Sequence, residues 1–93
     1  MARAKARHIL VETEAACLAL KEKIEAGADF AEVARAHSLC PSGNQGGLLG
    51  EFGPGQMVEE FDKVVFSGEV GKVLGPVRTQ FGYHLIEITS RTA

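Results

Sequence analysis

The sequence of 93 residues lacks the features that mark membrane and exported proteins. It has no tryptophan, and its apolar runs, such as Ala15–Leu20, fall far short of the roughly 20 residues that cross a bilayer. The basic N-terminus, Met1–Arg7, is not followed by an apolar segment long enough for a signal peptide. The sequence therefore predicts no membrane segment and no membrane partner.

Positive charge and cysteine are also scarce. The net charge is −2, and without a basic stripe a nucleic-acid partner is disfavoured, because phosphate binding needs clustered cations. The chain has two cysteines, Cys17 and Cys40, and no export signal precedes them. This favours reduced thiols rather than a disulfide, and we expect a cytoplasmic protein.

Motifs for metals and nucleotide phosphates are missing as well. The histidines and cysteines do not follow the spacings C-x-x-C or H-E-x-x-H. Neither G-x-x-x-x-G-K-S/T nor G-x-G-x-x-G occurs among the glycines, which instead favour tight turns. The sequence therefore predicts no metal and no cofactor.

The composition suits one globular domain over residues 1–93. The chain is 45% hydrophobic and 24% charged, and a chain of this size buries roughly 60–70% of its unfolded surface. Met1 favours a free-standing protein, which we expect to be a monomer.

Periodicity and turn residues predict an α+β domain with the order β-α-α-β-α-β-β and a mostly antiparallel sheet. Thr13 can cap the first helix and Gly27 can end it. Asp29 starts the second helix, with Glu32 completing a capping box. The Gly75-Pro76 pair makes its strand an edge or a bulged one. The predicted strands are 6–12, 48–52, 73–79 and 83–90, and the predicted helices are 14–26, 29–37 and 56–66.

Two histidines in strand-like runs are the first candidates for a site. His8 shares a strand face with Leu10, and His84 shares one with Ile86, because side chains alternate along a strand. If the two strands are neighbours, both imidazoles meet on one apolar face, where leaving each unpaired would cost about 1–3 kcal/mol. They are then either a functional network or satisfied core histidines. His37 marks the partly buried face of its helix and is expected to be structural.

Cys40 and an apolar pair suggest two different kinds of site. Cys40 can be the nucleophile of a thiol hydrolase with His8 or His84 as its base, but no nucleophile signature accompanies it. An unreactive thiol is the competing interpretation. Met57 and Phe61 are one helical turn apart and can line an apolar pocket, or belong to the core.

Taken together, these motifs resemble the parvulin family of peptidyl-prolyl cis/trans isomerases over essentially the whole chain. Single pieces such as Gly-Gln-Met are weak, but their order and spacing are specific. The resemblance implies a parvulin-like (FKBP-like) fold with a four-stranded sheet flanked by helices, and the compact length is similar to that of single-domain bacterial members. The residues that carry it are His8–Val11, Gly27–Phe30, Cys40–Gly43, Gly46–Phe52, Gly55–Val58, Phe61, Gly75–Val77, Thr79 and Phe81–Ile86.

The resemblance implies an enzyme that accelerates rotation about X–Pro bonds in peptides and in unfolded or partly folded proteins. It uses no covalent intermediate, so Cys40 is not expected to be a nucleophile, and the histidine pair is expected to be largely structural. The implied catalytic residues are His8, Cys40, Thr79 and His84. The implied substrate-binding residues are Leu49, Met57 and Phe61 around the proline ring, with Phe81 on the rim.

Two features of the chain bear on its specificity. Leu48 stands where relatives often have Asp, so a hydrogen-bond acceptor is missing from that loop. Glu12–Glu14 stands where phospho-specific members carry a basic cluster, so a phosphate before proline is expected to be repelled and an apolar residue to be preferred. The alternative function is a non-catalytic module that holds proline-containing segments.

Overall fold

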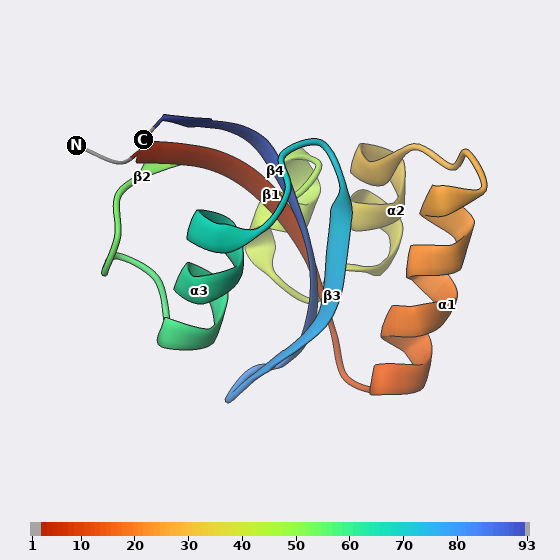
Figure 1. Cartoon of the computed structure of the whole chain (residues 1–93). Coiled ribbons are helices and arrows are strands. Elements are labelled where there is room, and N and C mark those ends of the chain that lie inside the picture. The colour runs from red at the N-terminus through yellow and green to blue at the C-terminus, as the bar shows by residue number, and fades with distance from the viewer. Residues whose placement is uncertain (1–2, 93) are drawn as a thin grey trace.

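The computed structural model describes residues 3–92 and builds them around one sheet. Its four strands are antiparallel in every pair and follow the order β2-β1-β4-β3. The central strands are β1 (Arg3–Val11) and β4 (Gly82–Thr92), and they lie side by side with Arg3 paired to Thr92 (Figure 1). The edge strands are β2 (Leu48–Phe52) and β3 (Val73–Thr79). The predicted α+β fold and its order of elements are confirmed.

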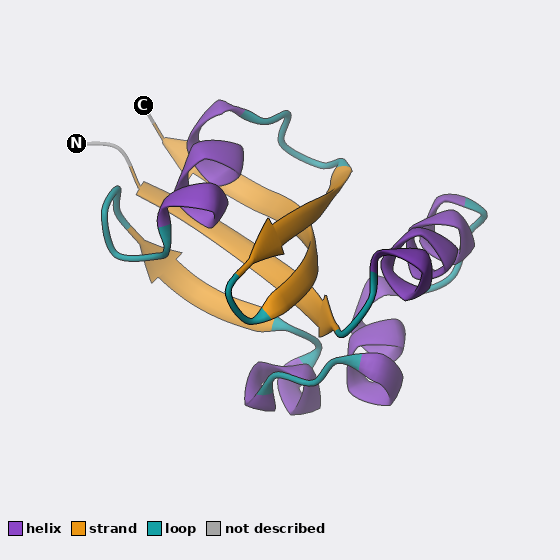
Figure 2. Cartoon of the chain, turned by 90° about the horizontal axis from the view of Figure 1, so that it is seen from below, coloured by secondary structure: helices purple, strands orange, loops and turns teal. Residues whose placement is uncertain are grey.

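Helices cover both faces of the sheet. The helices α1 (Glu14–Glu25) and α2 (Phe30–His37) lie on one side, and α3 (Glu59–Ser67) lies on the other, as Figures 1 and 2 show. No helix within residues 3–92 is long and apolar enough to cross a membrane.

Alternation along the central strands divides the core into two clusters. Ile9 and Val11 of β1 pack under α1 and α2, whereas Ala4 and Ala6 pack with α3. His8 has the parity of Ala4 and Ala6 and therefore points to the α3 side. The candidate site described below lies on the α3 side of the sheet.

The helix ends follow the predicted caps. The Thr13 hydroxyl accepts a hydrogen bond from the Ala16 N–H, and the Asp29 carboxylate accepts one from the Glu32 N–H. Gly27, in the left-handed region at φ 118°, follows the C-cap of α1. These contacts satisfy backbone groups that a helix end otherwise leaves without partners.

The structure corrects four details. Both central strands extend beyond their predicted bounds, since β1 begins at Arg3 rather than at residue 6 and β4 ends at Thr92 rather than at residue 90, where the two strands pair with each other. The α3 helix begins at Glu59 rather than at position 56, because Gly55 donates its N–H to the Asp62 carboxylate and holds the preceding segment in a turn. A 3₁₀ helix, η1 (Pro41–Gln45), occupies part of the segment for which no regular structure was predicted. His37 is exposed rather than partly buried.

The prediction of an edge or bulged strand for β3 is confirmed. Among residues 3–92, β3 pairs only with β4, and its register shifts between Leu74 and Val77, around the Gly75-Pro76 pair. Proline cannot donate to a sheet ladder, which is why this pair is compatible with an edge but not with the centre of the sheet.

A close backbone approach fixes the position of His8. The Gly47 carbonyl, just before β2, accepts a hydrogen bond of 3.0 Å from the His8 N–H. A Cβ atom on residue 47 would lie 2.3 Å from the His8 carbonyl oxygen, and φ is +83°, which side chains rarely adopt. Only glycine allows the loop to come this close.

Candidate functional site

The two strand histidines meet on the α3 side of the sheet. Leu10 of β1 pairs with His84 of β4, which places His8 diagonally opposite His84 on the same face. The two Nδ1 atoms are 3.0 Å apart, and the imidazole rings are stacked at an interplanar angle of 14°. Both side chains are buried. The expectation that the imidazoles share one face is confirmed.

Hydrogen bonds extend from this pair in both directions. On one side, His8 Nε2 lies 3.1 Å from Ser42 Oγ, and Ser42 Oγ donates to Cys40 Sγ over 3.3 Å. On the other, His84 Nε2 lies 2.8 Å from Thr79 Oγ1, which also accepts the Phe81 N–H. The result is a continuous chain of polar groups beneath the α3 face.

The hydrogen bonds in this series of polar groups all run in one direction, from Thr79 toward Cys40. Because the Ser42 hydroxyl donates to Cys40, it must accept from His8 Nε2–H. The His8 Nδ1 atom then carries no proton and accepts from His84 Nδ1–H, which leaves His84 Nε2 to accept from the Thr79 hydroxyl. With both imidazoles neutral, each hydrogen bond has one donor and one acceptor.

Burial keeps both imidazoles neutral. Burial, together with the smaller effect of the neighbouring His84, lowers the pKa of His8 from 6.5 to about 4. Burial also lowers the pKa of His84. A charged imidazolium is disfavoured here because the protein interior solvates ions poorly. At neutral pH the site therefore holds dipoles rather than positive charge.

Phe61 packs against the histidine pair and forms the floor of a cleft. Its ring meets the rings of His8 and His84 edge-on, at centroid distances of 5.7 and 6.0 Å. Phe61 is only 3% exposed and belongs to the core cluster beneath α3. It therefore holds the imidazoles in place while presenting apolar surface to the cleft.

The cleft itself is a cavity of about 390 Å³. Each predicted substrate-binding residue lines it, as do three of the four predicted catalytic residues; Thr79 does not, and reaches it only through His84. Phe81 is 62% exposed on the rim. The cleft is lined by His8, Leu10, Leu39, Cys40, Pro41, Leu49, Met57, Val58, Phe61, Phe81 and His84.

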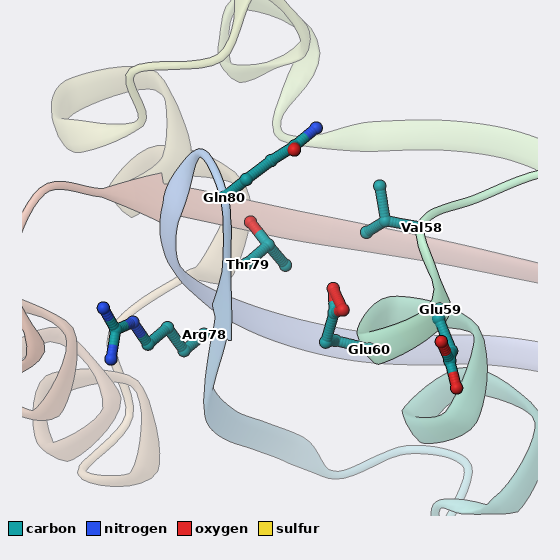
Figure 3. Close-up of a pocket in the computed structure, with 6 residues that line it drawn as sticks. All are labelled: Val58, Glu59, Glu60, Arg78, Thr79 and Gln80. Atoms are coloured by element: carbon teal, nitrogen blue, oxygen red, sulfur yellow. The ribbon is translucent and has the colours of Figure 1, made fainter.

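A polar hollow adjoins the cleft on one side, and Val58 lies in the walls of both. Figure 3 shows Glu60 reaching from the start of α3 toward Thr79, with Arg78 and Gln80 on the strand and turn opposite. Carboxylates and a guanidinium here make an unsuitable lining for a proline ring. The apolar cleft is therefore the candidate site for the ring.

Ser42 is the member of the polar chain that sequence reasoning missed. It stands two residues after Cys40 in Cys40–Gly43, where Pro41 begins η1 and turns the Ser42 hydroxyl between the sulfur and His8. A serine beside a turn has no distinctive pattern in the sequence. Its role depends on the packing of η1 against α2 and β2, which brings the Ser42 hydroxyl to His8.

The geometry favours positioning over covalent chemistry. Ser42, rather than an imidazole, is the hydrogen-bond partner of the Cys40 sulfur, so the Cys–His pair of a thiol hydrolase is not formed. Within residues 3–92, no group of His, Cys, Asp and Glu side chains is arranged to hold a metal ion. An apolar cleft over neutral dipoles can hold an uncharged ring and remove water from an adjoining amide.

Comparison with known proteins identifies the family of the chain. A family model described as "Rotamase: PPIC-type PPIASE domain" matches residues 4–90. The chain is 48% identical over 89 residues to the foldase protein PrsA of Exiguobacterium sibiricum, covering 94% of this chain and 29% of that protein. It is 42% identical over 96 residues to the chaperone SurA of Aromatoleum aromaticum, covering 94% and 22%. The chain thus spans less than a third of these curated relatives.

Solved structures agree in fold. The peptidylprolyl isomerase PrsA of Bacillus anthracis superposes with a TM-score of 0.95 at 35% identity, covering 99% of this chain and 43% of that one. The parvulin of Nitrosopumilus maritimus gives a TM-score of 0.87 at 35% identity, covering 97% and 98%. The second comparison shows that this fold also occurs as a chain of nearly the same extent.

Proposed function

The chain belongs to the PPIC-type family of peptidyl-prolyl cis/trans isomerases, and we propose that it accelerates rotation about X–Pro bonds in unfolded or partly folded proteins. The observation that carries this proposal is the cleft: an apolar wall of Leu49, Met57 and Phe61 set directly over two neutral imidazoles. A proline ring fits the first, and the peptide bond that precedes it lies near the second.

The reaction needs shape and desolvation rather than a nucleophile. Amide resonance sets a barrier of about 18–20 kcal/mol to rotation, and no covalent bond has to form or break. The twisted amide has lost resonance and much of its charge separation, so an apolar cleft favours it over the planar form. Met57 and Phe61 hold the ring while the remaining chain turns about the C–N bond. His8, His84 and Thr79 keep the floor of the cleft in one geometry.

The substrate is unphosphorylated, with an apolar residue before proline. Leu10 and Leu39 line the cleft at the end of β1, and the exposed Glu12 and Glu14 follow directly in the chain. A phosphate near this end would face carboxylates and gain no paired cation, which is unfavourable. An apolar side chain before proline would instead cover the exposed Leu39.

Exchange spectroscopy on an unphosphorylated Leu-Pro peptide tests the proposal. Accelerated cis/trans exchange with the peptide intact is expected, and Met57→Asn should lower kcat/KM about tenfold by making one wall polar. Met57→Leu is the matched control, because it conserves apolar volume. Folded protein that leaves exchange unchanged would refute the proposal. Peptide cleavage would instead indicate a hydrolase.

A binding module without catalysis is the second candidate, and the relatives named as a foldase and a chaperone favour it. The same spectra separate the two functions. Shifted peptide resonances without accelerated exchange would indicate holding alone.

We further propose that the protein acts as a cytoplasmic monomer, without a nucleic-acid or membrane partner. Two free thiols, one of them buried at Cys17, support a reducing compartment, and the net charge of −2 disfavours binding to phosphates. Fractionation and sedimentation test location and mass. Recovery outside the cytoplasm, or a dimer at micromolar concentration, would contradict the corresponding part.

A further inference from the structure

An exposed leucine is held rigidly beside the cleft. Leu39 is 62% exposed, yet its N–H donates to the Leu10 carbonyl over 2.8 Å. The Leu10 N–H in turn donates to the Ser38 hydroxyl over 3.1 Å. These bonds attach residues 38–39 to the end of β1, so the exposure of Leu39 is a fixed feature of the surface.

Leu39 separates the cleft from a further cavity. That cavity, of about 360 Å³, lies where the end of β1 meets α1 and α2, and Leu39 is in the walls of both. Val11 and Leu20 form its floor, and Ala16 and Ala19 of α1 line one side. The lining is predominantly apolar, and its polar members are Glu12 and His37, both exposed.

We propose that this second cavity, with Leu39 as its near wall, binds an apolar side chain of the substrate about three residues from the isomerised proline. The inference rests on the proposed function, since the occupant is a flanking segment of the same peptide. Continuity with the cleft through Leu39 identifies that occupant. The small alanine side chains leave open a surface that a leucine or phenylalanine of an unfolded chain can cover.

The spacing follows from the leucine that the two cavities share. The two cavities share only the Leu39 side chain, and an occupant on each side of it would contact that leucine at about 4 Å, so the two occupants lie on the order of 10 Å apart. An extended chain advances about 3.3 Å per residue, which gives about three residues between the two side chains.

Peptide pairs test this subsite. One pair carries Leu or Asn three residues before proline, and a second pair carries Leu or Asn three residues after it. In one of the two pairs, Leu should lower KM about fivefold to tenfold while kcat changes little, because remote apolar binding is felt equally by the ground state and the transition state. Only one pair should respond, because a bound chain runs in one direction.

Two alanines on α1 provide matched variants. Ala19→Glu places a carboxylate in the second cavity, whereas Ala15→Glu places one on an exposed position of the same helix that does not line it. Neither residue lines the cleft, so both variants should turn over a short Leu-Pro peptide normally. Ala19→Glu should abolish the preference for Leu over Asn, and Ala15→Glu should retain it.

Methyl NMR gives a readout that is independent of turnover. The Leu-containing peptide should shift the methyl resonances of Ala16, Ala19 and Leu20, and the short peptide should not. The inference would be overturned if the wild type showed no preference for Leu over Asn and these methyl resonances did not shift. It would also be overturned if both variants showed the same preference and the methyl resonances did not shift. If even the short peptide is not isomerised, the proposed function fails, while the methyl shifts still decide whether the cavity binds an apolar side chain.

Discussion

Protonation of the buried histidines should control stability in mild acid. The pKa of His8 is about 4 in the folded protein, against 6.5 when the side chain is solvated. Between these values the unfolded chain binds a proton that the folded chain does not, so stability rises with pH across this window. The contribution is complete above pH 6.5 and is lost as the pH falls toward 4.

The magnitude is large for a domain of this size. The interval from 6.5 to about 4, at about 1.36 kcal/mol per pKa unit, corresponds to about 3 kcal/mol. His84, whose pKa burial also lowers, acts in the same direction. Small domains are stable by only about 5–15 kcal/mol, so a substantial share of the free energy of unfolding should disappear in this window.

Urea unfolding between pH 7.5 and 4 measures the effect. His8→Gln keeps a hydrogen-bonding side chain but cannot take up the proton, so its free energy of unfolding should fall less than that of the wild type. His37→Gln is the control, because His37 is exposed and should leave the wild-type dependence intact. Carboxylates contribute alike in all three proteins. Equal losses in His8→Gln and the wild type would refute the reasoning.

Three further substitutions test the polar chain and its supports. Ser42→Ala removes the acceptor of His8 Nε2–H and should cost about 1–3 kcal/mol in urea melts, whereas Ser42→Thr should recover most of it; equal stability of both would exclude the bond. Gly47→Ala should unfold far more easily than Gly50→Ala, because both have positive φ but only residue 47 would meet the His8 carbonyl, at 2.3 Å; similar melting temperatures would contradict this. Cys40→Ser should keep kcat/KM within about 100-fold of wild type, and a loss of about 10⁶-fold, the scale for a true nucleophile, would show covalent catalysis.

Much of the fold was predictable because local patterns and tertiary packing agree. Thr13 and Asp29 cap the helices they were predicted to cap, and Gly75-Pro76 lies on an edge strand with a register shift. The start of α3 was placed too early, since the Gly55–Asp62 contact joins residues on either side of the helix start and leaves no local signal. The 3₁₀ helix η1 is short and follows no periodicity, so pattern reasoning gave no structure there.

The candidate site was likewise predictable in part, where strand geometry determines it, and not where it depends on the packing of a short turn. Strand alternation predicted that His8 and His84 would meet if their strands were neighbours, and the pairing of β1 with β4 fulfils that condition. The link from His8 through Ser42 to Cys40 depends on where a short turn packs, which no spacing rule specifies. The catalytic and substrate-binding roles assigned to the site residues stay predictions, which Cys40→Ser tests for catalysis and Met57→Asn tests for substrate binding.

The direction of the polar chain explains how such a network can lie beneath an apolar cleft. Each neutral imidazole carries one proton, so reversing the bond between the two histidines would remove the hydrogen that His8 Nε2 shares with Ser42, and the Ser42 hydroxyl would have to turn toward His8 as well. Reversal would also require the Cys40 thiol, a weak donor, to replace the Ser42 hydroxyl as the donor between them. At the other end, the Phe81 N–H occupies one lone pair of Thr79 Oγ1, and the hydroxyl hydrogen is left to donate to His84 Nε2. The network thus gives each of its polar groups a partner without any net charge, so the floor of the cleft can be polar underneath while the cleft itself stays apolar.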